Sequence, residues 1–102
     1  MSLLDRLLLW GPNKFRMRKI VKAFDGLFMC IEALSDDDLK KDYNELVRKC
    51  KADPEYYKMT KEKYGEVLRE IKILCNRIAI KMGGGTKLDH NMRVTLDDIQ
   101  RI

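Results

Sequence analysis

Glycine and proline are scarce in this chain, and they punctuate it at only a few points. The sequence has 2 Pro and 6 Gly in 102 residues, and three of the glycines are adjacent, at positions 83–85. Such a chain has too few turn signals for many short strands, whereas its apolar residues recur at helical spacing. Its length suffices for one hydrophobic core. We therefore predict an all-α fold, a small bundle of three to four main helices with short amphipathic N- and C-terminal helices.

The helical pattern divides this single domain into three parts. Residues 1–12 are predicted to form an N-terminal amphipathic arm, residues 13–82 the helical core, and residues 83–102 a glycine hinge with a short terminal helix. The apolar side chains of the arm are Leu3, Leu4, Leu7, Leu8 and Trp10. We expect the arm to cover the core as a flap; the alternative is an anchor for a membrane surface or a partner.

We predict a helix over residues 13–34, with Asn13 as its N-cap. Its apolar face contains Met17, Ile20, Val21, Phe24, Leu27, Phe28 and Ile31. The opposite side carries a basic row at four-residue spacing, Lys14, Arg18 and Lys22. Phe15 and Met29 fall on this basic side too, where they would serve a docking surface or a second packing contact inside the bundle. Gly26 weakens the middle of the helix and would allow a bend.

The net charge of +5 is concentrated in one stretch of this helix. Five bases and no acid lie between Asn13 and Phe24, namely Lys14, Arg16, Arg18, Lys19 and Lys22. Without them, the remaining 16 bases (21 − 5) balance the 16 acids. Such a patch attracts phosphate, anionic lipid or an acidic protein, or else it is a solvated helix face.

A capping pattern predicts that the next helix begins at Ser35. Ser35 is placed as the N-cap, with Asp38 at the third helical position. Leu34 and Leu39 would then form a hydrophobic staple. The acids at 36–38 suit the positive end of the helix dipole, and they lack the ligand spacing of a calcium loop, so we expect no metal there.

The same pattern recurs near the end of the chain, where Thr95 and Asp98 have the spacing of a capping box. Val94 and Ile99 would provide the staple. A short last helix is therefore predicted from Leu96.

Between these two regions, Asp53 as N-cap and Pro54 at the first helical position predict a helix that continues to Met82. The pattern could break near Thr60, which would give a short helix and a long one. The predicted apolar face consists of Tyr57, Tyr64, Val67, Leu68, Ile71, Leu74, Cys75, Ile78 and Met82.

Two isoleucines, Ile73 and Ile80, lie on the side of this helix opposite its apolar face. Either the helix is central in the bundle and covered on both sides, which we favour, or the pair marks a seam for self-association.

The residues that could carry chemistry are few and scattered. The chain has three cysteines, Cys30, Cys50 and Cys75, with no Cys-x-x-Cys spacing, so zinc is not expected. They are interpreted as small core residues of a protein in a reducing, cytoplasmic compartment. The single histidine, His90, lies in a predicted polar loop and is interpreted as a surface residue. The glycines at 83–85 do not match a phosphate-binding loop. We expect no catalytic site, metal, cofactor or small-molecule substrate.

Three stretches of the chain resemble the N-terminal helical segment of the SecA protein-translocation motor. Residues 16–21, Arg-Met-Arg-Lys-Ile-Val, are similar to its Arg-Met-Arg-Lys-Val-Val. Residues 34–39, Leu-Ser-Asp-Asp-Asp-Leu, resemble its Leu-Ser-Asp-Glu-Glu-Leu, and residues 67–70, Val-Leu-Arg-Glu, resemble its Val-Val-Arg-Glu. The family's nucleotide-binding and helicase motifs lie beyond this region and are missing here, so no ATPase residue carries over. The resemblance implies that residues 3–22 contact acidic lipid and the translocation channel.

These patterns together predict a non-enzymatic helical module that binds a protein partner or a second copy of itself. The expected binding residues are Lys14, Phe15, Arg16, Arg18, Lys19, Lys22 and Met29. A further interface would consist of the leucines and Trp10 of the arm with Ile73 and Ile80. Nucleic-acid binding through the basic stretch at 13–24 and peripheral binding to an anionic membrane are the alternatives.

Overall fold

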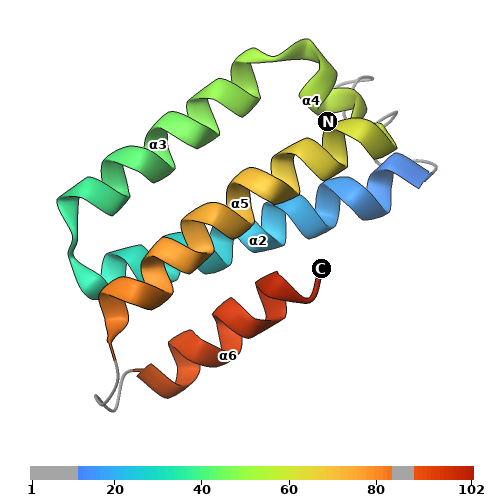
Figure 1. Cartoon of the computed structure of the whole chain (residues 1–102). Coiled ribbons are helices and arrows are strands. Elements are labelled where there is room, and N and C mark those ends of the chain that lie inside the picture. Colours follow the sequence, from blue (N-terminus) through green and yellow to red (C-terminus); the bar gives the residue numbers. More distant parts are fainter. Residues whose placement is uncertain (1–11, 84–88) are drawn as a thin grey trace.

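The computed structural model describes residues 12–83 and 89–102, and within these ranges the chain forms five helices and no strand (Figure 1). The helices are α2 (Pro12–Leu34), α3 (Asp37–Ala52), α4 (Pro54–Lys58), α5 (Lys61–Met82) and α6 (Asp89–Gln100). The prediction of a small all-α bundle is confirmed. The arm predicted over residues 1–12 lies outside the described residues, except for Pro12 at the start of α2.

The helices α2 and α5 form the central pair of the bundle and run in the same direction (Figure 1). The flanking helices α3 and α6 lie on opposite sides of this pair and run against it. Each flanking helix contacts both central helices. Because α3 and the short helix α4 return the chain to the end where α2 begins, α5 starts beside the start of α2.

The core lies between the central pair and its two flanking helices. The largest fully buried side chains are Ile20, Leu27, Ile31, Leu39, Met59, Ile71 and Ile78. Burial of each contributes roughly 1.5–3 kcal/mol relative to exposure. Five of the seven belong to the central pair, so α2 and α5 supply most of the interior against which α3 and α6 pack.

Gly26, where the sequence pattern would allow a bend, is the point at which α6 packs against α2. A Cβ atom on Gly26 would lie 2.9 Å from Thr95 Cγ2 and 3.2 Å from Ile99 Cδ1. Only a residue without a side chain permits this approach. Gly26 therefore sets the distance between the two helices.

The turn between α2 and α3 differs by one residue from the prediction. Ser35 has a left-handed backbone, with φ of 53°, and its N–H donates to the carbonyls of Ile31 and Glu32 at 3.0 and 3.3 Å, so it ends α2. The N-cap of α3 is Asp36, whose Oδ1 accepts a hydrogen bond from Leu39 N at 3.0 Å. Only two residues lie between the helices: Ser35 ends α2, and Asp36 caps the start of α3. The prediction that Ser35 is the N-cap is therefore wrong.

The boundaries around α4 agree with the sequence. Asp53 is the N-cap, Pro54 is in the first turn, and Met59 ends the helix with a left-handed backbone at φ of 40°. Thr60 then caps α5, because its side chain accepts from Lys63 N at 3.2 Å. The structure therefore has the break near Thr60 that the sequence left open, and not one continuous helix to Met82.

The last helix was predicted to start at Leu96, but it starts at Asp89. Thr95 lies inside α6 and donates from Oγ1 to the Asn91 carbonyl at 2.9 Å, which satisfies its hydroxyl without a helix end. The early start also places His90 in the first turn of α6, not in a loop. The helix is a full member of the bundle, since its apolar residues are buried: Met92, Leu96 and Ile99.

Two apolar faces were predicted too broadly or in the wrong register. Val21 and Phe28, assigned to the core, are 47% and 43% exposed. Tyr57, also assigned to the core, is 36% exposed, while its neighbour Tyr56 is buried. The break between α4 and α5 changes the register of this short helix, which is why Tyr56 is buried in place of Tyr57.

Candidate docking face

The outward side of α2 exposes four large apolar side chains. Phe15 is 64% exposed and Met29 50%, and Val21 and Phe28 are nearly half exposed. Phe15 and Met29 are fourteen residues apart, and Val21 and Phe28 are seven apart, so the two members of each pair lie close together around the helix, while the two pairs are about 110° apart. We call this surface, with the bases that lie between these residues, the α2 outward face.

The bases of α2 divide into two groups. Arg18, Lys19 and Lys22 are exposed, and Lys14 is partly exposed. Arg16 instead serves the fold, because its Nη1 donates to Asn13 Oδ1 at 3.0 Å and to the Met59 carbonyl at 3.4 Å. The structure thus places the predicted binding residues on the α2 outward face with the exception of Arg16, which ties α2 to the α4–α5 turn.

A groove with a volume of about 530 Å³ lies between α2 and α6 at the edge of this face. Its apolar lining consists of Ala23, Gly26, Met29, Ile99 and Ile102. Ala23 and Ile99 are buried and form its floor, whereas Met29 is half exposed and stands at its wall. No local pattern in the sequence indicates this groove, since it depends on the packing of α6 beside Gly26.

Four charged side chains line the groove: Lys19, Lys22 and Asp25 from α2 and Asp98 from α6. All four are exposed. None of them forms an ion pair with another residue in the ranges 12–83 and 89–102. The rim therefore presents both signs of charge around an apolar floor.

On its other edge the α2 outward face meets α3 through aromatic contacts. The Tyr43 ring lies 6.0 Å from Phe24 in an edge-to-face arrangement and 5.7 Å from Phe28, centroid to centroid. Burial raises the pKa of the Tyr43 hydroxyl above its ordinary value. Phe28 is thus held in place by α3 while part of its ring remains exposed.

Ile73 and Ile80 lie on a different face, on α5. Although α5 is a central helix, Ile73 is 49% and Ile80 79% exposed, so the explanation that we favoured from the sequence, coverage on both sides, is wrong. A shallow groove between α3 and α5, of about 250 Å³, includes Ile73 and the ion-paired Arg77 and Asp42.

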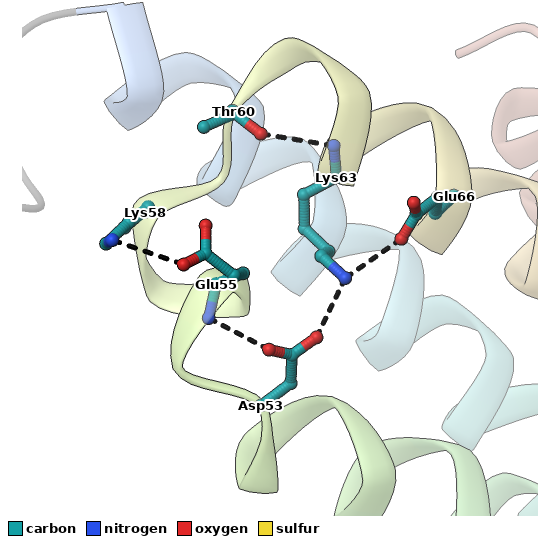
Figure 2. A network of polar contacts seen from close by, with 6 residues as sticks. All are labelled: Asp53, Glu55, Lys58, Thr60, Lys63 and Glu66. Atoms are coloured by element: carbon teal, nitrogen blue, oxygen red, sulfur yellow. Dashed lines mark hydrogen bonds and ion pairs between the residues drawn. The ribbon is translucent and has the colours of Figure 1, made fainter.

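The turn around α4 is fastened by a polar network that the sequence analysis did not identify (Figure 2). Lys63 Nζ donates to Asp53 Oδ2 at 2.7 Å and to Glu66 Oε2 at 2.9 Å, while the other Asp53 oxygen accepts from Glu55 N at 2.9 Å. These contacts hold the pKa of Asp53 below its ordinary value, chiefly through the Lys63 hydrogen bond, and raise that of Lys63.

The same network borders a pocket of about 260 Å³ that includes Cys50 and Tyr56. Burial raises the pKa of Tyr56 to about 12, and it also raises the pKa of Cys50. Neither group is therefore ionised near neutral pH, and the network is satisfied by its own members. We interpret this region as a structural joint.

The other two thiols are also enclosed in the core. Cys30 and Cys75 are buried and free, and each contacts a carbonyl of α6, Met92 O at 4.0 Å and Leu96 O at 3.5 Å, respectively. Burial raises the pKa of Cys30 to about 11. Within the described parts of the chain, no group of three or more His, Cys, Asp or Glu is arranged to hold a metal ion.

The predicted interface residues of the arm, namely Leu3, Leu4, Leu7, Leu8 and Trp10, lie outside the described residues. Among the helices that are described, none is long and apolar enough to cross a membrane. No protein-family model, no curated protein and no solved structure matches the chain. The surface itself is thus the basis for assigning a function.

Proposed function

We propose that this protein is a non-enzymatic helical interaction module that binds a protein partner through the α2 outward face. The observation that carries the proposal is the exposure of Phe15 and Met29, at 64% and 50%, among the exposed bases of one helix. Single exposed apolar residues are common on monomeric proteins. Four on one helix, beside an apolar groove, are typical of a contact surface.

The charges around these residues support a protein partner of complementary sign. Arg18, Lys19 and Lys22 would attract an acidic surface and increase the rate of encounter. Binding energy would then come from burial of the apolar side chains, chiefly Phe15 and Met29, in a complementary partner surface.

The chemistry of the interior supports a function without catalysis. A nucleophilic thiol needs a lowered pKa and access to substrate. The three thiols of this chain are buried, and burial raises the pKa of each. His90 is exposed on α6.

Nucleic acid and anionic membrane are the alternatives for the same bases, and the resemblance to SecA would imply the membrane. Both are polyanionic surfaces, which bind best to uninterrupted positive charge. Asp25 and Asp98 stand beside Lys22 around the groove and reduce that attraction. A protein surface with charges of both signs fits this arrangement better.

The test is site-specific photocrosslinking in the cell from which the chain derives. A photoreactive phenylalanine analogue replaces Phe15 in the full chain, and a matched variant carries it at Val94, which is 49% exposed on α6 and does not line the groove. We expect one discrete protein adduct from position 15 and none from position 94. Adducts to nucleic acid or lipid alone, or equal adducts from both positions, would contradict the proposal.

Self-association is a second candidate role, favoured by the exposure of Ile73 and Ile80 on α5. The two residues are seven apart and present an apolar ridge of two helical turns, as in a helix-pair seam. This contact would leave the α2 outward face accessible, because it uses another helix.

A further inference from the structure

We propose that the groove between α2 and α6 binds an amphipathic helix of the partner protein, with a carboxylate toward Lys19 and Lys22 and a basic side chain toward Asp25 and Asp98. This inference rests on the proposed function and specifies the partner's chemistry. The groove carries it because an apolar floor and a rim of both signs occur together.

The dimensions of the groove fit a short helix. Along α2 it extends from Lys19 to Met29, which is about 15 Å at the helical rise of 1.5 Å per residue. About three turns of a bound helix would cover this length. Apolar side chains at the first, fifth and eighth positions of such a helix would face the floor.

The floor and wall differ in how they can adapt. Ala23 is buried and small, which allows the backbone of a bound helix to approach α2 closely. Met29 is flexible and half exposed, and methionine is common on surfaces that adjust to a bound helix. Ile102 also lines the groove and is partly buried.

The rim specifies the charge pattern of the occupant. Along α2 the order is Lys19, Lys22 and then Asp25, and Asp98 faces them from α6. A uniformly acidic helix would meet repulsion from the two carboxylates, whereas a helix with acid at one end and base at the other would meet complementary charge at both. This local pattern opposes the preference expected from the net charge of +5.

The experiment compares a mixed-charge helix, which the groove rim should prefer, with an acidic helix, which the net charge should prefer. Two synthetic peptides of about three turns are stapled into helices, since unstapled helices of this length are marginal in water. Both carry leucines at the first, fifth and eighth positions. One has glutamates at one end and lysines at the other, and the second has glutamates at both ends. Each is labelled and titrated with the full-length protein in a fluorescence anisotropy assay.

We expect the mixed-charge peptide to bind about tenfold more tightly than the acidic peptide, a difference of about 1.4 kcal/mol. The variant Asp25→Asn/Asp98→Asn should lose or reverse this preference, while Met29→Glu should weaken both peptides. Circular dichroism of each variant verifies that the fold is retained. Equal binding of the two peptides, tighter binding of the acidic one, or no binding would overturn the inference.

The same variants distinguish two other occupants of the groove, the N-terminal arm and a second copy of the chain. Trp10 is the only tryptophan, so its fluorescence reports on the N-terminal arm. A change in this emission caused by Met29→Glu without peptide would show that the arm fills the groove, and a dimer that Met29→Glu dissociates would show that a second copy does. Either result overturns the inference. The photocrosslink from position 15 does not depend on the peptide experiment. Failure of the peptides to bind as expected would therefore leave the proposed function standing, whereas absence of the crosslink would remove both the proposed function and this inference.

Discussion

Thr95 of α6 lies against Gly26 of α2 so closely that a Cβ atom on the glycine would be 2.9 Å from Thr95 Cγ2. This contact sets the separation of α2 and α6, and with it the width of the groove between them. The glycine is therefore required by packing between helices, although glycine is unfavourable inside a single helix.

Gly26→Ala should destabilise the protein for this reason. Overpacking costs about 1–3 kcal/mol, and the gain in helix propensity is about 1 kcal/mol, so we expect a net loss of about 1 kcal/mol in the free energy of unfolding. Chemical denaturation followed by circular dichroism measures it.

Gly65 provides the matched control, because it lies in α5 and a Cβ atom there would have no neighbour within 4 Å. Gly65→Ala should stabilise by about 0.5–1 kcal/mol. Thr95→Ser, which removes Cγ2 and keeps the hydroxyl, should restore part of the loss in Gly26→Ala. If both alanine variants change stability in the same direction, the packing role of Gly26 is wrong.

Acid should destabilise the fold through the two aspartates that cap helices. The pKa of Asp36 is lowered, chiefly by the hydrogen bond from Leu39 N, and that of Asp53 is lowered by Lys63. Since both carboxylates bind protons less readily when folded, their contribution is complete above the unfolded pKa of about 3.9 and is lost as pH falls through the folded values.

Denaturation curves recorded between neutral pH and about pH 2 should therefore show a loss of stability that begins below about pH 5. Asp53→Asn retains an N-cap acceptor but loses the ion pair with Lys63, so its stability should depend less steeply on pH than that of the wild type. An unchanged pH profile in this variant would show that the joint drawn in Figure 2 does not stabilise the fold.

The thiols should resist alkylation until the protein opens. Cys30 is fully buried and its pKa is raised to about 11, so at pH 8 it reacts only from an open state. Cys50, which is 8% exposed and lines a pocket, should react first. Mass spectrometry of iodoacetamide-treated protein gives the order, and Cys50→Ser should remove the fastest phase. Rapid labelling of Cys30 in native buffer would contradict the packing of α6 over it.

Self-association through α5 should depend on Ile80, the most exposed large hydrophobic side chain in the described part of the chain, at 79%. Sedimentation velocity should show a mass that rises with concentration, and Ile80→Glu should abolish this rise. Val94→Glu, an equivalent change on another face, should have no effect. A strict monomer at high concentration would eliminate the α5 seam and leave the α2 outward face as the contact.

Local sequence signals predicted the helix boundaries well where only one residue nearby could take the capping role. Asp53 and Pro54 begin α4, and Thr60 divides it from α5, because a cap and a proline act through the adjacent backbone. The pattern at Thr95 failed because its hydroxyl has an alternative acceptor four residues earlier, inside the helix. Ser35 and Asp36 were confused because either can cap a helix.

The candidate site was predictable only in part. Helical spacing placed Phe15 and Met29 together with the bases, as the structure has them. It could not separate Arg16 from its neighbours, since the acceptor at Met59 is 43 residues away in the chain. Nor could it show that Val21 and Phe28 remain exposed, because the width of the covered face of α2 depends on how closely α3 packs.

The opposed courses of the central and flanking helices keep the net helix dipole of the molecule small. The N-termini of α2 and α5 lie at the same end, where their partial positive charges, about half a unit each, are opposed by the partial negative charges at the C-termini of α3 and α6, which point toward that end. Side-chain charge therefore decides the potential at the start of α2: its first turn has no acid and contains Lys14, and Arg16 and Arg18 lie in the next turn, whereas the first turn of α5 contains Glu62. In solution negative potential would attract the start of α2 through these bases before any of them makes contact.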